Sequence, residues 1–183
     1  MRLKPKQTAY VASKIGIDLA NTPFVSLPKG KDAVVKICKD IIDENLKKEK
    51  RLDAKVEELL LENEDEIEIQ HIKERELFFM IKKRLAPEYG VIMNYDDRYN
   101  EISHIILDEL YENYLIDYDV NDNKVRNVIF KAFKAFANAY DEIDTTVYEN
   151  IKKMKKEYIP GSLEYELIYE RLYKEELQKR GMI

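Results

Sequence analysis

The residues with the clearest chemical potential are two glutamate–histidine pairs of identical spacing. Glu68 and His71 form one Glu-x-x-His sequence, and Glu101 and His104 form another. Residues three apart share one face of a helix. Paired Glu-x-x-His motifs supply ligands to di-iron and di-manganese centres in helical bundles. These four residues are therefore candidate metal ligands, and they include both histidines of the chain.

A hydrated helix surface is the alternative interpretation of both histidines, and the sequence favours it. Charged residues make up 37% of the chain, so a glutamate three positions before a histidine arises easily by chance. His104 also shares a helical stripe with Glu101, Asp108 and Tyr111, which is typical of a solvent-facing side. The sequence accordingly predicts no metal ion and no other cofactor.

Basic residues gather at the start of the chain, where they suit contacts with phosphate groups. Arg2, Lys4, Lys6 and Lys14 all precede the first acidic residue, Asp18. The net charge of −5 weighs against general nucleic-acid binding, which usually needs a strongly basic face. A hydrated helix face explains the same residues, so RNA binding through the basic N-terminal half is the second choice.

Conventional catalysis has no support in the residue pattern. The five glycines form no phosphate-binding loop. Cys38, the only cysteine, falls on the apolar side of a predicted helix, where a thiol is inert. A single cysteine forms no intrachain disulfide, which fits a reducing compartment. We therefore lean against an enzyme and expect a cytoplasmic protein without a signal peptide or a membrane span.

Glycine and proline divide the chain into long uninterrupted segments. Neither residue occurs between Lys31 and Ala86, or between Val91 and Ile159. Apolar residues there recur every three or four positions, which predicts amphipathic helices. The sequence leaves open whether the two longest helices are continuous. The predicted helices are 6–20, 31–62, 66–86, 95–113, 122–158 and 163–179.

The two halves of the sequence match each other at an offset of 91 residues. This offset aligns Val11 with Ile102 and Asp53 with Asp144. Both halves also read in the same order: helix, short extended hinge, long helix, turn, helix. This shared order predicts an internal duplication, with repeats 1–90 and 91–183 sharing one core. We expect the hinges at 24–26 and 115–118 to pair across a pseudo-twofold axis as a two-stranded ribbon.

Three stretches of the chain resemble one protein family. They are the opening Met1–Gln7, the acidic segment Glu62–Glu68, and Met80–Lys83 followed by Asn94–Arg98. Together they resemble a bacterial family known as domain of unknown function 507, over nearly the whole chain. The resemblance implies a bacterial, cytoplasmic protein, and it brings no activity, cofactor or site residue with it.

Tyrosine is concentrated in the second half, where eleven of the thirteen tyrosines follow residue 90. Tyrosine combines apolar area with a polar tip and is enriched at interfaces, although packing at the core boundary is the alternative.

The prediction is an all-α, elongated helical bundle of about six main helices in two pseudo-repeats, with two short extended hinges. The predicted function is non-enzymatic protein–protein interaction or scaffolding, with a partner protein or a second copy. RNA binding and a helical-bundle metal site are the alternatives. The biochemical activity, the identity of the partner and the oligomeric state stay open.

Overall fold

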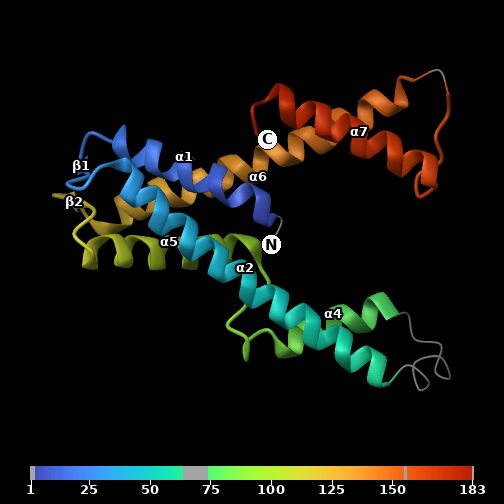
Figure 1. The fold of residues 1–183 in the computed structure, drawn as a ribbon, viewed down its shortest axis with the longest axis horizontal. Helices are drawn as coiled ribbons and strands as arrows, with labels where there is room; N and C mark the ends of the chain where they lie inside the picture. The colour runs from blue at the N-terminus through green and yellow to red at the C-terminus, as the bar shows by residue number, and fades with distance from the viewer. Residues whose placement is uncertain (1–2, 64–73, 155, 183) are drawn as a thin grey trace. The chain divides into compact units, whose positions relative to one another are not determined.

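The computed structural model describes residues 3–63, 74–154 and 156–182, and these are predominantly helical (Figure 1). The predicted all-α class is confirmed, since β1 and β2 are the only strands in the described ranges. The elements are η1 Pro5–Gln7, α1 Thr8–Ala20, β1 Val25–Ser26, α2 Lys31–Glu62, α4 Glu74–Leu85, α5 Tyr95–Glu112, β2 Asp117–Tyr118, α6 Asp122–Lys152 and α7 Leu163–Lys179.

Short polar residues and glycines set the helix ends, much as the sequence predicts. The Ser162 hydroxyl accepts a hydrogen bond from the Tyr165 backbone N–H at 3.2 Å and so caps α7. The Asn94 side chain caps α5 in the same way. Gly90 and Gly161 have φ values of +61° and +86°, which only glycine adopts readily, and the chain turns at both.

Both long helices are continuous, which answers a question that the sequence leaves open. In α6 the sequence allows a break at Asp144–Thr145, because a threonine can cap a new helical segment. Instead the Thr145 hydroxyl donates to the Asp141 carbonyl oxygen at 2.9 Å, within the same helix. Its polar group is thus satisfied without a break. The helix then ends at Lys152 rather than at 158.

The two extended hinges pair as a short antiparallel ribbon, as predicted. Val25 lies opposite Tyr118, and Ser26 lies opposite Asp117. The ribbon joins the chain between α1 and α2 to the chain between α5 and α6.

The chain forms two compact units, which we call the first unit (Met1–Phe130) and the second unit (Lys131–Ile183). The helix α6 contributes residues to both. The predicted sequence repeats, 1–90 and 91–183, have a different boundary from these units. The division into two repeats stays a prediction.

Within the first unit, α2 supplies the central apolar surface, and different parts of it contact different helices (Figure 1). The helices α1, α4 and α5 all pack on it. Each fully buried aliphatic side chain stabilises the fold by about 1.5–3 kcal/mol. The C-terminal half of α2 and the α4 hairpin share a cluster formed by Leu52, Val56, Leu60, Ala86 and Val91, against which Leu77, Phe78, Ile81, Leu85 and Tyr89 pack.

Within the second unit, aromatic rings form a ladder between α6 and α7. The Tyr140 ring lies 4.4 Å from Phe136 and 6.4 Å from Tyr173, measured between centroids. Tyr173 stacks on Tyr169, and Tyr169 stacks on Tyr165. The Tyr169 hydroxyl donates to the Asp144 carboxylate. Most of these tyrosines therefore join the two helices, as core-boundary packing requires.

Among the described residues, no helix combines the length and the apolar character needed to cross a membrane.

Candidate functional site

A buried arginine lies at the junction of α2 and α5. The Arg98 side chain, only 2% exposed, reaches from the first turn of α5 to α2. Its Nε donates to the Asn45 Oδ1 at 2.7 Å, and its Nη1 donates to the Glu49 Oε2 at 2.9 Å. Its Nη2 donates to the Asn45 carbonyl oxygen at 3.1 Å. The guanidinium is therefore bound through all three of its nitrogens, as a buried charge requires.

A second buried cation extends this network to α4. The Lys82 Nζ lies 3.1 Å from the Glu49 Oε1 and 2.6 Å from the Asp53 Oδ1. Burial by itself raises the pKa of the Glu49 carboxyl, but the surrounding cations, Arg98 and Lys82 among them, hold that pKa at about 2. Glu49 is thus a permanent anion at neutral pH and is no general acid or base. The network ties α2 to α4 and α5.

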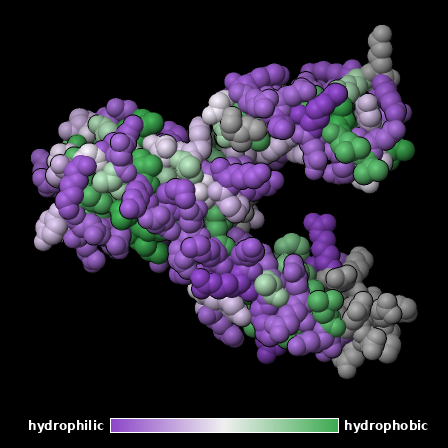
Figure 2. Space-filling model, viewed as in Figure 1, coloured by the Kyte–Doolittle hydropathy of each residue, from purple (hydrophilic) through white to green (hydrophobic). Residues whose placement is uncertain are grey.

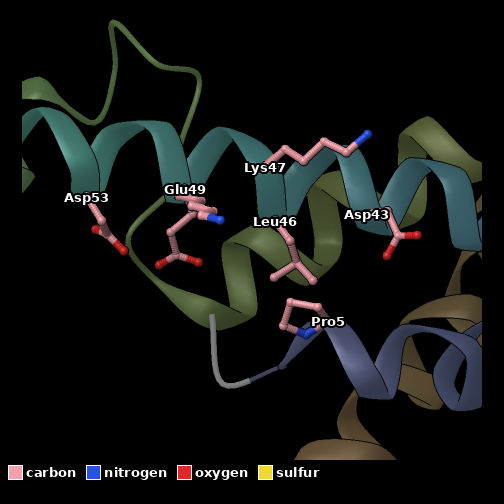
Figure 3. Close-up of a pocket in the computed structure, with 7 residues that line it drawn as sticks. Pro5, Asp43, Leu46, Lys47, Glu49 and Asp53 are labelled. Atoms are coloured by element: carbon pink, nitrogen blue, oxygen red, sulfur yellow. The ribbon is translucent and has the colours of Figure 1, made fainter.

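An open groove of about 550 Å³ runs along α2 beside this network (Figure 3). Figure 3 shows the Leu46 side chain pointing from α2 towards Pro5, with Asp43, Glu49 and Asp53 projecting from the same helix. Lys47 and Lys50 add positive charge to its lining. The groove offers an apolar strip flanked by charges of both signs.

Sequence reasoning missed the residues of this network, although a signal was present. On α2, Cys38, Ile42, Leu52 and Val56 are fully buried. The three-to-four spacing of this stripe continues through positions 45 and 49, which hold asparagine and glutamate instead of apolar residues. Polar residues at core positions of an amphipathic helix predict a buried partner. The sequence did not indicate which residue that partner would be.

Of the four candidate metal ligands, only Glu101 and His104 lie among the described residues. Glu68 and His71 lie outside those ranges. The imidazole of His104 contacts the Arg126 guanidinium, whose Nη1 lies 3.4 Å from Nδ1 and closer still to Nε2. A cation against these ring nitrogens opposes metal binding there, and Glu101 is exposed. No cluster of three or more His, Cys, Asp or Glu side chains in the described residues has the arrangement of a metal site.

The basic residues of the N-terminus are only partly described. Arg2 lies outside the described ranges, and Lys4 and Lys6 are exposed around η1. Lys14 forms an ion pair of 2.8 Å with Asp18 on α1, which reduces its availability for phosphate. Nucleic-acid binding through these residues stays a prediction.

Cys38 is buried, as predicted from its place on the apolar side of α2. Burial raises the pKa of the Cys38 thiol to about 12. At neutral pH the thiol is therefore fully protonated, and it is not a nucleophile.

The most exposed apolar side chains of the second unit lie around the start of α7. Leu163 is 77% exposed and Leu167, one turn later, is 60% exposed. Ile159, in the turn before the helix, is also exposed. Figure 2 shows hydrophobic residues gathered over this end of the unit.

The described residues form a predominantly helical fold whose strands are limited to the short β1–β2 pair. Residues 1–182 match the family described as "Protein of unknown function (DUF507)", and the chain belongs to that family. The resemblance seen in the sequence is thereby confirmed. No curated protein matches the chain.

Proposed function

We propose that the protein is a non-enzymatic interaction module that uses the start of α7 to dock on another protein chain. The observation that carries this proposal is the exposed apolar face formed by Ile159, Leu163 and Leu167, which we call the α7 face. Scattered exposed leucines are ordinary on protein surfaces. Neighbouring ones on one helix face are typical of an interaction site.

Comparison with the first repeat supports this proposal. An offset of 90 residues aligns Leu77 of α4 with Leu167 of α7. Leu77 packs against the apolar cluster of α2, whereas Leu167 is mostly exposed. The second repeat thus leaves open a position that the first repeat covers with its own chain. Covering Leu163 and Leu167 with a partner contributes about 1.5–3 kcal/mol for each side chain.

The shape of the α7 face favours a helix-in-groove interaction. Leu163 and Leu167 are four residues apart, which places them on one side of the helix. The Ser162 cap fixes the first turn, so that little order is lost on binding. A partner would supply a complementary apolar groove. The proposal includes a cytoplasmic location, which a single reduced cysteine suits.

The test is purification of tagged wild-type protein and of the Leu163→Ser/Leu167→Ser variant from the native cell, with and without nuclease. Leu61→Ser is the matched control, because Leu61 is 71% exposed on α2. A partner that survives nuclease, is lost from the double variant and is kept by the control supports the proposal. Light scattering on the pure protein shows whether that partner is a second copy.

Two results would contradict the proposal. Partners retained by the double variant would show that the α7 face is not used. Partners released by nuclease would favour the nucleic-acid alternative instead.

A further inference from the structure

A second pocket lies in the first unit, at the C-terminal end of α5, and is separate from the α7 face. Its volume is about 500 Å³. Leu107 and Val120 provide its apolar lining. The other lining residues carry acidic or phenolic groups: Asp108, Tyr111, Glu112, Tyr118 and Asp122.

The surroundings of this pocket are strongly acidic. Residues 91–130 contain nine Asp or Glu and three Lys or Arg, a net charge of −6. Of these three bases, Arg98 is buried on Glu49 and Arg126 contacts His104. Within the described residues, none of Asp108, Glu112 and Asp122 forms an ion pair. Among the described residues, the carboxylates that line this pocket therefore have no ion-pair partner.

Two aromatic rings add a second kind of attraction for cations. Tyr111 and Tyr118 have their ring centroids 6.0 Å apart and their planes tilted by 53°. Tyr111 is 61% exposed, so its ring is accessible from solvent. The Tyr118 hydroxyl donates to the Asp122 Oδ1 at 3.0 Å, which fixes the second ring. An ammonium or guanidinium group near such rings gains cation–π energy as well as ion-pair energy.

The end of α5 is itself an attractive site for a positive charge, and the chain already places one there. The C-terminus of a helix carries a partial negative charge, so acidic residues in the last turn are unfavourable. The last turn of α5 has no basic residue, yet it contains Glu109 and Glu112. The Lys29 Nζ donates to the Asn113 carbonyl oxygen at 2.8 Å, directly after this helix. An ammonium group therefore binds this helix end within the structure.

We propose that this pocket, which we call the α5 pocket, binds a lysine or arginine side chain from a basic segment of a partner protein. Its negative charge complements that of the ligand, and its rings give the contact more specificity than charge alone. A divalent metal ion is a poorer fit, because these carboxylates do not form a metal-binding cluster among the described residues. The proposal does not depend on the α7 face.

The test measures binding of a fluorescent lysine-rich peptide by anisotropy at low ionic strength, with a glutamate-rich peptide of equal length as the ligand control. Asp108→Asn/Glu112→Gln is expected to weaken binding about three- to tenfold, as the loss of two exposed ion pairs requires. Tyr111→Leu keeps the charge and is expected to weaken binding about two- to fivefold. Glu170→Gln/Glu175→Gln, an equal charge change on exposed residues of α7, is expected to leave binding unchanged.

A stability measurement separates a binding role from a structural one. Because acidic groups at a helix C-terminus are unfavourable, Asp108→Asn/Glu112→Gln is expected to keep or raise the midpoint of thermal unfolding while binding weakens.

The proposal fails if the α7 control weakens binding as much as the pocket variant does, since general charge attraction would then explain the data. It also fails if Tyr111→Leu has no effect on binding of the peptide. A third contrary result is that binding of calcium ions or free spermidine depends on the pocket residues while binding of the peptide does not. The Leu163→Ser/Leu167→Ser variant is expected to bind the peptide as the wild type does. The proposal for the α5 pocket and the proposal for the α7 face can therefore fail independently.

Discussion

Ser26 lies directly opposite Asp117 in the ribbon, and the Ser26 hydroxyl donates to the Asp117 carbonyl oxygen at 3.5 Å. The two residues are 91 positions apart, which is the offset that aligns the two halves of the sequence. If a twofold axis passes between two paired residues of the ribbon, those two residues must occupy equivalent positions in the two halves. The observed register agrees with a local pseudo-twofold axis through the ribbon, and the relation between the two halves stays a prediction.

Two further correspondences follow the same offset. The helices α2 and α6 begin at Lys31 and Asp122, which are 91 residues apart. Asp53 of α2 and Asp144 of α6 are also 91 residues apart, and each contacts a helix later in the chain. Asp53 forms an ion pair with Lys82 of α4, and Asp144 accepts a hydrogen bond from Tyr169 of α7. At these two aligned positions, different side chains link the helix pairs, an ion pair for Asp53 and a hydrogen bond for Asp144.

The register of the ribbon is testable with an engineered disulfide. Opposite residues of an antiparallel pair have Cα atoms about 4.5–5.5 Å apart, within the range of a disulfide. Ser26→Cys/Asp117→Cys is therefore expected to oxidise readily to an intrachain disulfide, seen by mass spectrometry. Ser26→Cys/Asn121→Cys is the control and is expected to stay reduced. Equal oxidation of the two variants would contradict the register.

Removing the Arg98 guanidinium is expected to destabilise the first unit strongly. Arg98→Leu leaves Asn45 without its side-chain donor and removes one cation from partly buried Glu49. Loss of one partner of a buried ion pair typically costs about 3–5 kcal/mol. Urea unfolding followed by circular dichroism measures this loss. Arg171→Leu, on the exposed side of α7, is the control and is expected to change stability by less than about 0.5 kcal/mol. A loss below about 1 kcal/mol for Arg98→Leu would show that the network contributes little.

Glu49 is expected to make the stability of the protein fall in acid. Its pKa of about 2 in the folded protein lies below the value of about 4.3 for an unfolded glutamate. Stabilisation by Glu49 is therefore complete above about pH 4.5 and is lost as the pH falls towards 2. The free energy of unfolding, measured in urea at several pH values, is expected to fall less steeply over this window in Glu49→Gln than in the wild type. Identical slopes would contradict the assigned pKa.

Cys38 is expected to resist alkylation while the protein is folded. Because burial raises the pKa of the thiol to about 12, almost no thiolate is present at pH 8. An unfolded cysteine has a pKa of about 8.5 and reacts readily. Iodoacetamide labelling followed by mass spectrometry is expected to be at least about a hundredfold slower in buffer than in denaturant. Fast labelling of the folded protein would reveal a reactive thiol.

Helix starts and chain reversals are the features of this structure that the sequence predicts well. The start of α7 at Ser162 and the reversals at Gly90 and Gly161 depend only on residues next to them. The ribbon is also predictable, because the offset of 91 residues aligns the two hinges although they are distant in the sequence.

The candidate sites were harder to predict, because each depends on contacts between distant residues. Arg98 and Glu49 are 49 positions apart, and only packing of α5 on α2 shows that they meet. The α5 pocket depends on the chain after β2 returning to the end of α5. Thr145 misled the prediction of α6 because its hydroxyl can cap a helix or bond within one, and the sequence does not distinguish the two.

Site-specific photocrosslinking in the native cell tests the central proposal most directly. A photoreactive amino acid placed at Leu163 reports what covers the α7 face, and the same group at Leu61 reports an equally open surface elsewhere. The proposal predicts one defined protein adduct at position 163, absent at position 61 and abolished by Leu167→Ser. No adduct at position 163, or the same adducts at both positions, would contradict it.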